Sequence, residues 1–593
     1  MSKFLFSVPP GLVSDDTSMA ASGRWADGSN VRFWNGLPEA VGGWESITPD
    51  HLLGVCRAVM QWTDKTGQLN IALGAHSALQ VWRGGSLFDI TPLHALPGRT
   101  LAANPFAVTL GSSTVEVHAP NHGLTLGEAV VISGATAVGG LSVGGGVQVA
   151  TVINSDRFAF AAPGVATATA VGGGGGVNIF PQRAFLPGQI DGAGGAGYGA
   201  GAYSTASYSI PSTAEYFPRT WSLGAWGENL LASPRGGAIY AWANNTAARS
   251  APLLNAPARS TAMLVAPQDQ IFALGCDEEA TGVFNPLCIR HSGVRADTEW
   301  STGPDTTARE YVLPGGGRIV SGRVLGTSLL VWTSHALFLG TFVGALDQPW
   351  RFDRIGENCG LVGPNAAVVA GRQAVWLGPD LQFYRYDLAG APELVVCPIR
   401  SEMVDNFARG QGDKVVASSN SAFGEVRFDY PDARDGLENS RYLCLSLIDG
   451  TWSRGVMART AMTDAGPSPS PVGVHPNGSI YWHERGESAD GMPLAWFVET
   501  ADRYLSEDST LLVRGVWPDF DEQRGPVSIT LKARNTPQGE VTSEQVVALA
   551  PGQSKADLRL SGRLFSVRFA GNSSPTRWRL GRPVFDIAPA GGR

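Results

Sequence analysis

The feature that most constrains the fold is a pattern of four short apolar runs separated by tight turns. In residues 54–92 the runs CRAVMQW, LNIALG, ALQVW and SLFDI are separated by the turn segments DKTG, GAHS and RGG. Four consecutive short strands at this spacing favour one antiparallel sheet, which is the unit of a β-propeller blade. The pattern returns at 221–244, 318–343, 366–388 and 425–455, and more weakly at 471–486.

Tryptophan recurs in these repeats on a strand of alternating apolar residues. The tryptophans concerned are Trp82, Trp242, Trp332, Trp376 and Trp482. The spacing is loose and no fixed signature repeats, so an ordinary stack of hairpins with Trp as core filling is an alternative. We predict an all-β chain built around a multi-bladed β-propeller. One apolar stripe, formed by Ile399, Met403 and Phe407, predicts a connecting helix between blades.

Two regions depart from the blade pattern. Residues 101–171 alternate strongly and are rich in Val and Ala, which predicts a small β-module inserted into the propeller. A glycine-rich connection follows at 172–207. From 500 to 593 the alternating runs favour a C-terminal β-sandwich. We therefore expect a leading segment with the first blade in 1–100, and the remaining blades in 208–499.

Composition agrees with a folded, turn-rich chain. Glycine accounts for 75 of 593 residues, but the 17 Trp and 24 Phe argue against disorder, because disordered segments lack large apolar side chains. The net charge of −8 argues against tight, general binding of nucleic acid, which uses basic patches. The N-terminus lacks the apolar run of a signal peptide, and no stretch approaches the ~18 apolar residues of a membrane span. We expect a soluble protein that is synthesised in a cytoplasm.

The six cysteines are scattered along the chain without a C-x-x-C motif. Disulfide frameworks belong to small secreted domains, so we predict free and mostly buried thiols. A pair between Cys276 and Cys288 is the alternative. The other four cysteines are Cys56, Cys359, Cys397 and Cys444.

Catalytic, cofactor and metal motifs give no convincing match. GAGGAG at 192–197 has the form of a dinucleotide-binding fingerprint, but the following YGAGAYSTASYS does not start a helix. His118 and His122 are four apart in a strand-and-turn segment, which indicates a structural role. The clusters Asp277, Glu278, Glu279 and Asp519, Asp521, Glu522 have the residue types for calcium binding or glycoside hydrolysis. We interpret both clusters as solvated turns.

A single DGTW sequence, Asp449 to Trp452, combines a tight turn with a Trp that is expected to pack into a sheet. It faintly resembles the Asp-box of sialidase propellers, but one copy without an arginine triad is a weak indication of such an enzyme. We therefore predict a protein that is not an enzyme, with no catalytic residue, no cofactor and no metal.

Three stretches resemble the tail nozzle and hub proteins of short-tailed bacteriophages, the family that includes the packaged-DNA stabilisation proteins. The first runs from Trp25 through WADGSNVRFWNGLPE to Trp44, and the second from Phe423 to Trp452. The third contains RLFSVRF from Arg563, RWRLG from Arg577 and the terminal Gly592-Arg593. HAPNHGLTLGEAVVISG, from His118 to Gly134, resembles a small β-module named after ubiquitin-activating enzymes. No Cys lies between Cys56 and Cys276, so this module has no thioester chemistry.

The resemblance implies a structural role in the virion tail. Such a subunit would form a homo-oligomeric ring, expected to be a hexamer, that retains packaged DNA and conducts it during ejection. Its partners would be an adaptor or portal-side protein, tail fibre or needle proteins, and double-stranded DNA that passes without specific binding. The alternative is a receptor- or glycan-binding β-propeller of a tail fibre or host-recognition apparatus.

Overall fold

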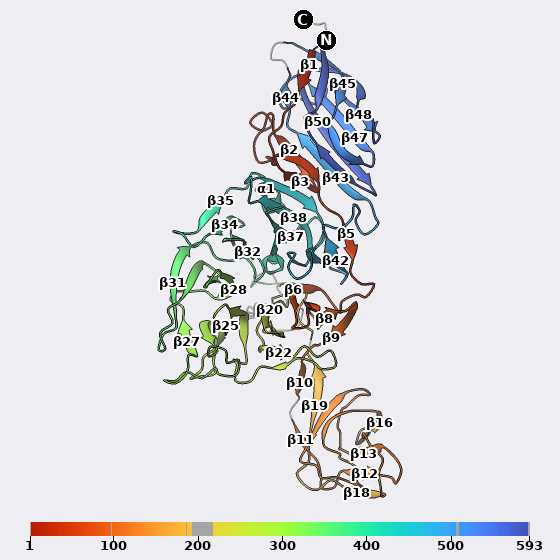
Figure 1. Cartoon of the computed structure of the whole chain (residues 1–593), viewed down its shortest axis with the longest axis vertical. Helices are drawn as coiled ribbons and strands as arrows, with labels where there is room; N and C mark the ends of the chain where they lie inside the picture. Colours follow the sequence, from red (N-terminus) through yellow and green to blue (C-terminus); the bar gives the residue numbers. More distant parts are fainter. Residues whose placement is uncertain (1, 96–97, 186, 193–216, 506–508, 591–593) are drawn as a thin grey trace, which may run out of the picture. The chain divides into compact units, whose positions relative to one another are not determined.

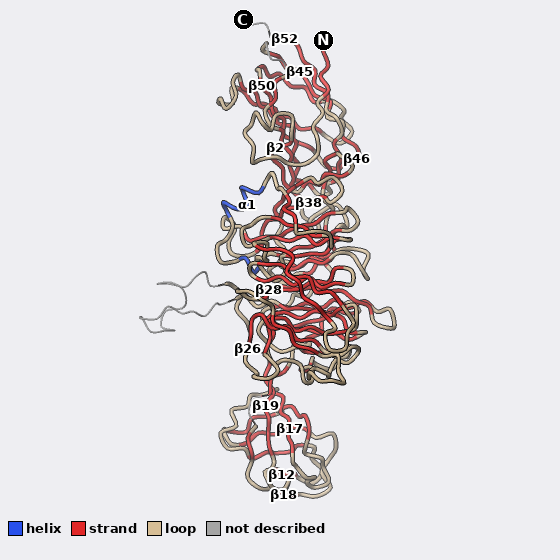
Figure 2. The backbone as a smooth tube through the Cα atoms, turned by 90° about the vertical axis from the view of Figure 1, so that its left-hand side faces the viewer, coloured by secondary structure: helices blue, strands red, loops and turns tan. Residues whose placement is uncertain are grey.

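The computed structural model describes residues 2–95, 98–185, 187–192, 217–505 and 509–590. Nearly all its regular structure is β-strand (Figure 2). Contacts divide the chain into two compact units. The first comprises 1–89, 188–244 and 252–593, and the second comprises 90–187 and 245–251.

The described part of the first unit contains seven four-stranded antiparallel sheets that follow one another as propeller blades (Figure 1). Blade 1 has β6 (Cys56–Thr63), β7 (Leu69–Ala75), β8 (Leu79–Arg83) and β9 (Ser86–Asp89). Blade 2 has β20 (Trp221–Trp226), β21 (Asn229–Pro234), β22 (Tyr240–Trp242) and β23 (Ala251–Pro252). Blade 3 has β24 (Ser260–Ala266), β25 (Gln270–Asp277), β26 (Phe284–His291) and β27 (Arg309–Val312). Blade 4 has β28 (Ile319–Leu325), β29 (Ser328–Thr333), β30 (Ala336–Phe342) and β31 (Trp350–Glu357).

The last three blades complete the circle. Blade 5 has β32 (Ala367–Ala370), β33 (Gln373–Leu377), β34 (Phe383–Tyr386) and β35 (Glu393–Val395). Blade 6 has β36 (Val416–Asn420), β37 (Glu425–Pro431), β38 (Asn439–Ser446) and β39 (Trp452–Val456). Blade 7 has β40 (Ala461–Thr463), β41 (Val472–Val474), β42 (Ile480–His483) and, from the N-terminal region, β5 (Trp44–Ser46). The innermost strand of each blade contacts the next, and β40 contacts β6, so the ring of blades is closed. The prediction of an all-β propeller is therefore confirmed.

The tryptophans that mark the repeats pack between adjacent blades. Each of the five belongs to a pair of aromatic rings whose members come from neighbouring blades. These side chains therefore pack between blades and stabilise their contact, in addition to filling the core of a single hairpin. The pairs and their centroid separations are Trp332–Trp376 at 5.4 Å, Trp82–Trp482 at 6.2 Å and Trp62–Trp242 at 6.4 Å.

The predicted connecting helix is present as α1 (Arg400–Asn406), between blades 5 and 6, with Met403 buried. A 3-10 turn, η1 (Gly412–Lys414), follows it.

The C-terminal strands form a sandwich together with the N-terminal ones. One sheet has the order β1 (Ser2–Leu5), β52 (Val584–Pro589), β45 (Leu511–Trp517), β49 (Ala556–Gly562). A second has the order β2 (Trp25–Ser29), β43 (Leu494–Thr500), β50 (Leu564–Ser573), β47 (Val527–Arg534), β48 (Ser543–Leu549), and β44 (Arg503–Tyr504) also pairs with β50. A third has the order β3 (Val31–Trp34), β4 (Leu37–Ala40), β51 (Arg577–Leu580), β46 (Phe520–Arg524).

This arrangement differs from the expected domain order at the N-terminus. Within the expected segment 1–100, β1 to β4 belong to the sandwich, β5 to blade 7, and only β6 to β9 form blade 1. The β3–β4 hairpin turns on Asn35-Gly36, both with positive φ, and this is a local signal for a two-residue turn. Pairing with strands more than 430 residues away leaves no local signal, so sequence patterns did not indicate it.

The second unit has two sheets and a core of its own. One sheet has the order β10 (Leu93–Ala95), β19 (Asn178–Ala184), β14 (Ala129–Ser133), β15 (Gly145–Gln148), and β11 (Arg99–Thr100) also pairs with β19. The other has the order β16 (Thr151–Asn154), β17 (Arg157–Ala161), β13 (Thr114–His118), β12 (Phe106–Val108), β18 (Ala170–Gly172). The core, with Phe106, Phe158 and Ile179 among its members, draws only on residues 101–179. Of the expected connection 172–207, residues 178–184 form β19, and 193–207 lie outside the described residues.

Candidate functional site: the propeller axis and the sandwich junction

A cavity of about 510 Å³ lies on the propeller axis, and all seven innermost strands contribute to its lining. Ala225 is one of the lining residues and is exposed, so the cavity is open to solvent at this residue. Close packing of the strands around the cavity requires glycine. A Cβ on Gly322 of β28, in blade 4, would lie 2.6 Å from the Leu264 side chain of blade 3. The cavity is therefore a product of blade closure.

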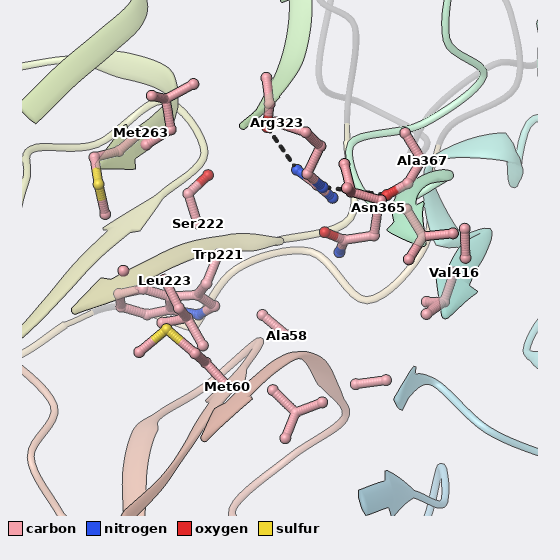
Figure 3. Close-up of a pocket in the computed structure, with 18 of the residues that line it drawn as sticks. Ala58, Met60, Trp221, Ser222, Leu223, Met263, Arg323, Asn365, Ala367 and Val416 are labelled. Carbon is pink, nitrogen blue, oxygen red and sulfur yellow. Dashed lines mark hydrogen bonds between the residues drawn. The ribbon is translucent and has the colours of Figure 1, made fainter. Parts of the chain in front are cut away.

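Polar side chains reach the cavity from three blades (Figure 3). Ser222 lies on β20, Arg323 on β28, and Asn365 just before β32. The Arg323 guanidinium donates to the carbonyl oxygens of Ala367 and Pro364, both at 3.1 Å, and so ties blade 4 to blade 5. Burial lowers the pKa of Arg323 to about 10.

A buried ionic cluster stands beside the cavity at the start of β6. Arg57 donates to both carboxylate oxygens of Glu438, at 2.7 and 3.1 Å, and to the Ile190 carbonyl at 2.9 Å. Lys414 Nζ also lies 3.0 Å from Glu438 and 2.6 Å from Asp191. Removing charges from water is costly unless they are paired, and here each cation has a carboxylate.

A second buried network joins blade 6 to the sandwich. Arg32 of β3 contacts Glu425 of β37 at 2.7 Å and Glu484 at 2.6 Å. Burial alone would lower the pKa of Arg32, but the two carboxylates outweigh it and raise that pKa above its ordinary value. Burial raises the pKa of Glu425, and Arg32 opposes that rise. This bidentate geometry fixes β3 against the edge of blade 6.

Further contacts follow the same junction. The Val456 amide donates to Asn30 Oδ1 at 3.1 Å, and Asn30 Nδ2 donates to the Ala495 carbonyl at 2.9 Å. Arg454 Nη2 lies 2.6 Å from Asp27 Oδ1. Asn30 therefore links a blade strand to a sandwich strand through a single side chain.

The residues weighed as sites in the sequence lie in structural settings. Trp452 is buried, and its Nε1 donates to the Val396 carbonyl at 2.9 Å. His122 accepts from the Leu124 amide through Nδ1, packs on Phe158, and has Nε2 2.9 Å from the Asn154 carbonyl. His118 is exposed on β13.

The two acidic clusters are tied to their own surroundings. Asp277 pairs with Arg259 at 2.7 Å, Glu278 accepts from Asn285, and Glu279 accepts from the Thr302 amide. Asp519 accepts from the Arg582 amide, Asp521 accepts from the Glu522 amide, and Glu522 pairs with Arg577. In the described parts of the chain no group of three or more His, Cys, Asp or Glu side chains is placed to hold a metal ion. No described helix is long and apolar enough to cross a membrane.

The cysteines are free and buried, as predicted. Cys276 and Cys288 lie on adjacent strands with their sulfur atoms 3.7 Å apart. The GAGGAG segment lies outside the described residues except for Gly192. Sequence reasoning missed Ser222, Arg323 and Asn365, because each lies in an ordinary strand or turn sequence and only blade closure brings them together.

Comparison with known proteins yields fold likeness only. No family model and no curated protein matches the chain. Among solved structures, BamB from Moraxella catarrhalis is 12% identical, with 44% of this chain and 81% of that chain covered and a TM-score of 0.27. The AfRom2 CNH domain is 10% identical, with 48% and 86% covered and a TM-score of 0.29. The endosialidase of phage phi92 is 12% identical, with 66% and 52% covered and a TM-score of 0.19, so this chain spans about half of it. Likenesses this weak carry no argument, and the propeller assignment rests on the strand pairing.

Proposed function

We propose that this chain is a non-enzymatic structural subunit of a bacteriophage tail, of the nozzle or hub type. The observation that carries the proposal is the meeting of the three stretches that resemble this family. They are separated by hundreds of residues, yet the first supplies Arg32 and Glu39, the second Glu425, and the third Arg579. Arg32 pairs with Glu425, and Glu39 pairs in register with Arg579 between β4 and β51.

Resemblance concentrated at one buried junction supports a shared architectural element. Independent chance likenesses would have no reason to contact one another. The junction fixes the sandwich to the propeller, and a part that holds pressurised DNA needs a rigid connection of this kind. Its partners would be further copies of this chain in a ring, expected to be a hexamer, an adaptor or portal-side protein, and tail fibre or needle proteins.

The size of the axial cavity constrains where DNA would pass. A volume of about 510 Å³ is that of a small-molecule site, so a duplex does not fit through the propeller itself. In the proposed ring the conduit therefore lies between subunits. The net charge of −8 is in keeping with a conduit that does not hold the duplex by strong phosphate contacts.

The test is imaging of the virion that carries this chain, with an epitope tag at residue 593 detected by a gold-labelled antibody. We expect labels at the tail and a ring density into which the propeller and sandwich fit. Labels on fibres alone, or a tail reconstruction without a ring that fits this chain, would refute the proposal.

One cleft supports the second candidate, a receptor- or glycan-binding propeller. It measures about 420 Å³, and its lining combines the half-buried aromatic rings of Trp34 and Phe423 with Glu39, Glu487 and Arg577. Aromatic faces with carboxylates and guanidinium groups suit a polyhydroxyl ligand. Binding of the free chain to defined glycans, lost on Trp34→Ala, would favour this candidate over the ring.

A further inference from the structure

The axial cavity has the dimensions and access of a ligand site. Its volume of about 510 Å³ falls within the roughly 300–1,000 Å³ that is typical of small-molecule pockets. The lining residues that the structure describes are contributed by the inner strands of a closed ring and include no Asp or Glu. A site built on strands is preformed, so little ordering is needed when a ligand binds.

The lining offers two kinds of surface. Met60, Leu223 and Met263 contribute apolar side chains to the lining, and methionine adapts to irregular apolar groups. Ser222, Arg323 and Asn365 supply polar groups, with Arg323 and Asn365 side by side in Figure 3. Asn365 Nδ2 donates to the Arg57 carbonyl at 2.7 Å. A ligand that fits both surfaces has an apolar body and one polar end.

Arg323 sets the charge of that polar end. Within the described part of the chain its guanidinium makes four hydrogen bonds, all to neutral acceptors: the Ala367, Pro364 and Gly322 carbonyls and the Ser321 hydroxyl, at 2.9–3.1 Å. Arg57 and Arg32, by contrast, each contact carboxylates. A guanidinium has five N–H donors, so one remains for a ligand. The lowered pKa of Arg323, caused by burial, agrees with a charge that lacks a counter-ion.

Among the described residues, the cavity carries one positive charge without a carboxylate partner, that of Arg323, because Glu438 neutralises the other lining arginine, Arg57. A single charge suits a monoanion better than a phosphate ester. We propose that the axial cavity binds a small amphipathic carboxylate, with its carboxylate at Arg323 and its alkyl chain along Met60 and Met263. This inference is independent of the proposed tail function.

The experiment is calorimetric titration of the full chain with octanoate, octanamide and octylamine, which share one alkyl chain and differ in head-group charge. We expect octanoate to bind at least tenfold more tightly than octanamide, and octylamine to give no binding. Equal affinity for octanoate and octanamide, or preferential binding of octylamine, would overturn the proposal. Absence of octanoate binding at millimolar concentration would overturn it too.

Two variants locate the interaction. Arg323→Met removes the charge and keeps much of the side-chain length, and it should weaken octanoate binding at least tenfold while leaving octanamide binding unchanged. Arg354→Met is the matched control on β31 of the same blade, where Arg354 is half-exposed and pairs with Glu357 at 2.9 Å. It should bind octanoate like the wild type. Equal loss in both variants, or no loss in Arg323→Met with native circular dichroism, contradicts the assignment.

A measurement on the wild-type chain tests the site even if the Arg323→Met variant misfolds. Crystals of the full chain soaked with 8-bromooctanoate should give an anomalous bromine peak between β6, β20 and β24, with carboxylate density at Arg323. A bromine peak only elsewhere on the molecule would refute the site, whatever the variants show.

Discussion

Arg32 Nε lies 2.7 Å from Glu425 Oε1 across 393 positions of sequence, and this contact joins a sandwich strand to a propeller blade. Both side chains are buried. Arg32→Met should therefore destabilise the protein by about 3–5 kcal/mol at neutral pH, because it leaves the buried Glu425 and the half-buried Glu484 without their cation. The loss should shrink on acidification, because burial raises the pKa of Glu425 and this carboxyl group becomes neutral as the pH falls.

Urea denaturation at pH 7 and at pH 5 measures this effect. Arg385→Met is the matched control, since Arg385 forms an exposed pair with Glu393 on blade 5. Its effect should stay within about 0.5 kcal/mol. Equal stability of the Arg32 and Arg385 variants would show that the junction pair adds nothing.

Trp452→Ala tests the DGTW turn of blade 6. The indole is buried, lies 4.6 Å from the Phe383 ring between centroids, and donates to Val396. We expect a loss of about 3–5 kcal/mol in the free energy of unfolding, as for other large core truncations. Ile448→Ala, at an exposed site four residues earlier, is the control. A Trp452 variant that melts with the wild type would contradict the burial.

The stability of blade 3 should decrease at acidic pH because of His291. It is buried between Phe272 and Tyr311, and burial lowers its pKa from 6.5 to about 4. The unfolded chain therefore binds a proton that the folded chain does not, in the window between pH 6.5 and about 4. Its stabilising contribution is complete above pH 6.5 and falls through that window by up to about 3 kcal/mol.

Chemical denaturation at half-unit pH steps gives the slope. His291→Leu should flatten it between pH 6.5 and 4, whatever its effect on absolute stability at pH 7. His483, His76 and His475, whose pKa values burial also lowers, contribute to the slope that remains. An unchanged slope in His291→Leu would mean that this imidazole is protonated in the folded protein.

The inserted unit should be dispensable for folding of the propeller. Its core lies within 101–179, and the Leu101 amide donates to the Val177 carbonyl at 2.7 Å, so the two ends of the core segment are close. Replacing 102–176 by a two-glycine turn should leave the main unfolding transition of the propeller in place. The check is differential scanning calorimetry with analytical ultracentrifugation. Insoluble or fully unfolded product would show that the insert is required.

The isolated chain should bind duplex DNA weakly or not at all at about 0.15 M salt, where the Debye length is about 8 Å. Acidic residues outnumber Lys and Arg by 52 to 44, and many arginines at the junction and blades are paired with carboxylates. Fluorescence anisotropy with a labelled duplex measures this. Sub-micromolar affinity that falls steeply with salt would instead indicate a basic DNA-binding surface, and it would contradict the proposed role as a conduit.

Local patterns predicted the parts of the fold that form locally. The hairpins of the blades and the connecting helix at Met403 depend on neighbours in sequence, and the structure has them. The local turn predicts that Trp452 is buried, and it is buried, but its contacts Phe383 and Val396 lie 69 and 56 positions earlier. The expected blade count stayed open because blades such as blade 3, at 260–312, have long and irregular connections. The resemblance to nozzle and hub proteins stays a prediction.

Long-range pairings were beyond the reach of sequence patterns. Trp44 of β5 pairs with His483 of β42 in the backbone register that completes blade 7. A three-residue strand has no sequence feature that would predict this partner. The cavity residues were also not predictable from local sequence. Nothing in the sequence around Arg323 distinguishes it from other strand arginines, because its partners Ala367 and Pro364 come from the region of blade 5. Burial without a counter-ion is a property of the assembled ring and has no signature in one segment.

Closure of blade 7 by β5 has a consequence for how the chain is made. Residues 44–46 leave the ribosome long before their partner strand at 480–483, and at about 5–20 residues per second the delay is roughly 20–90 s. During this interval β5 has no partner strand, and its backbone stays open to chaperones and proteases. A polypeptide truncated before blade 7 never closes its ring, so degradation would remove incomplete chains before they accumulate.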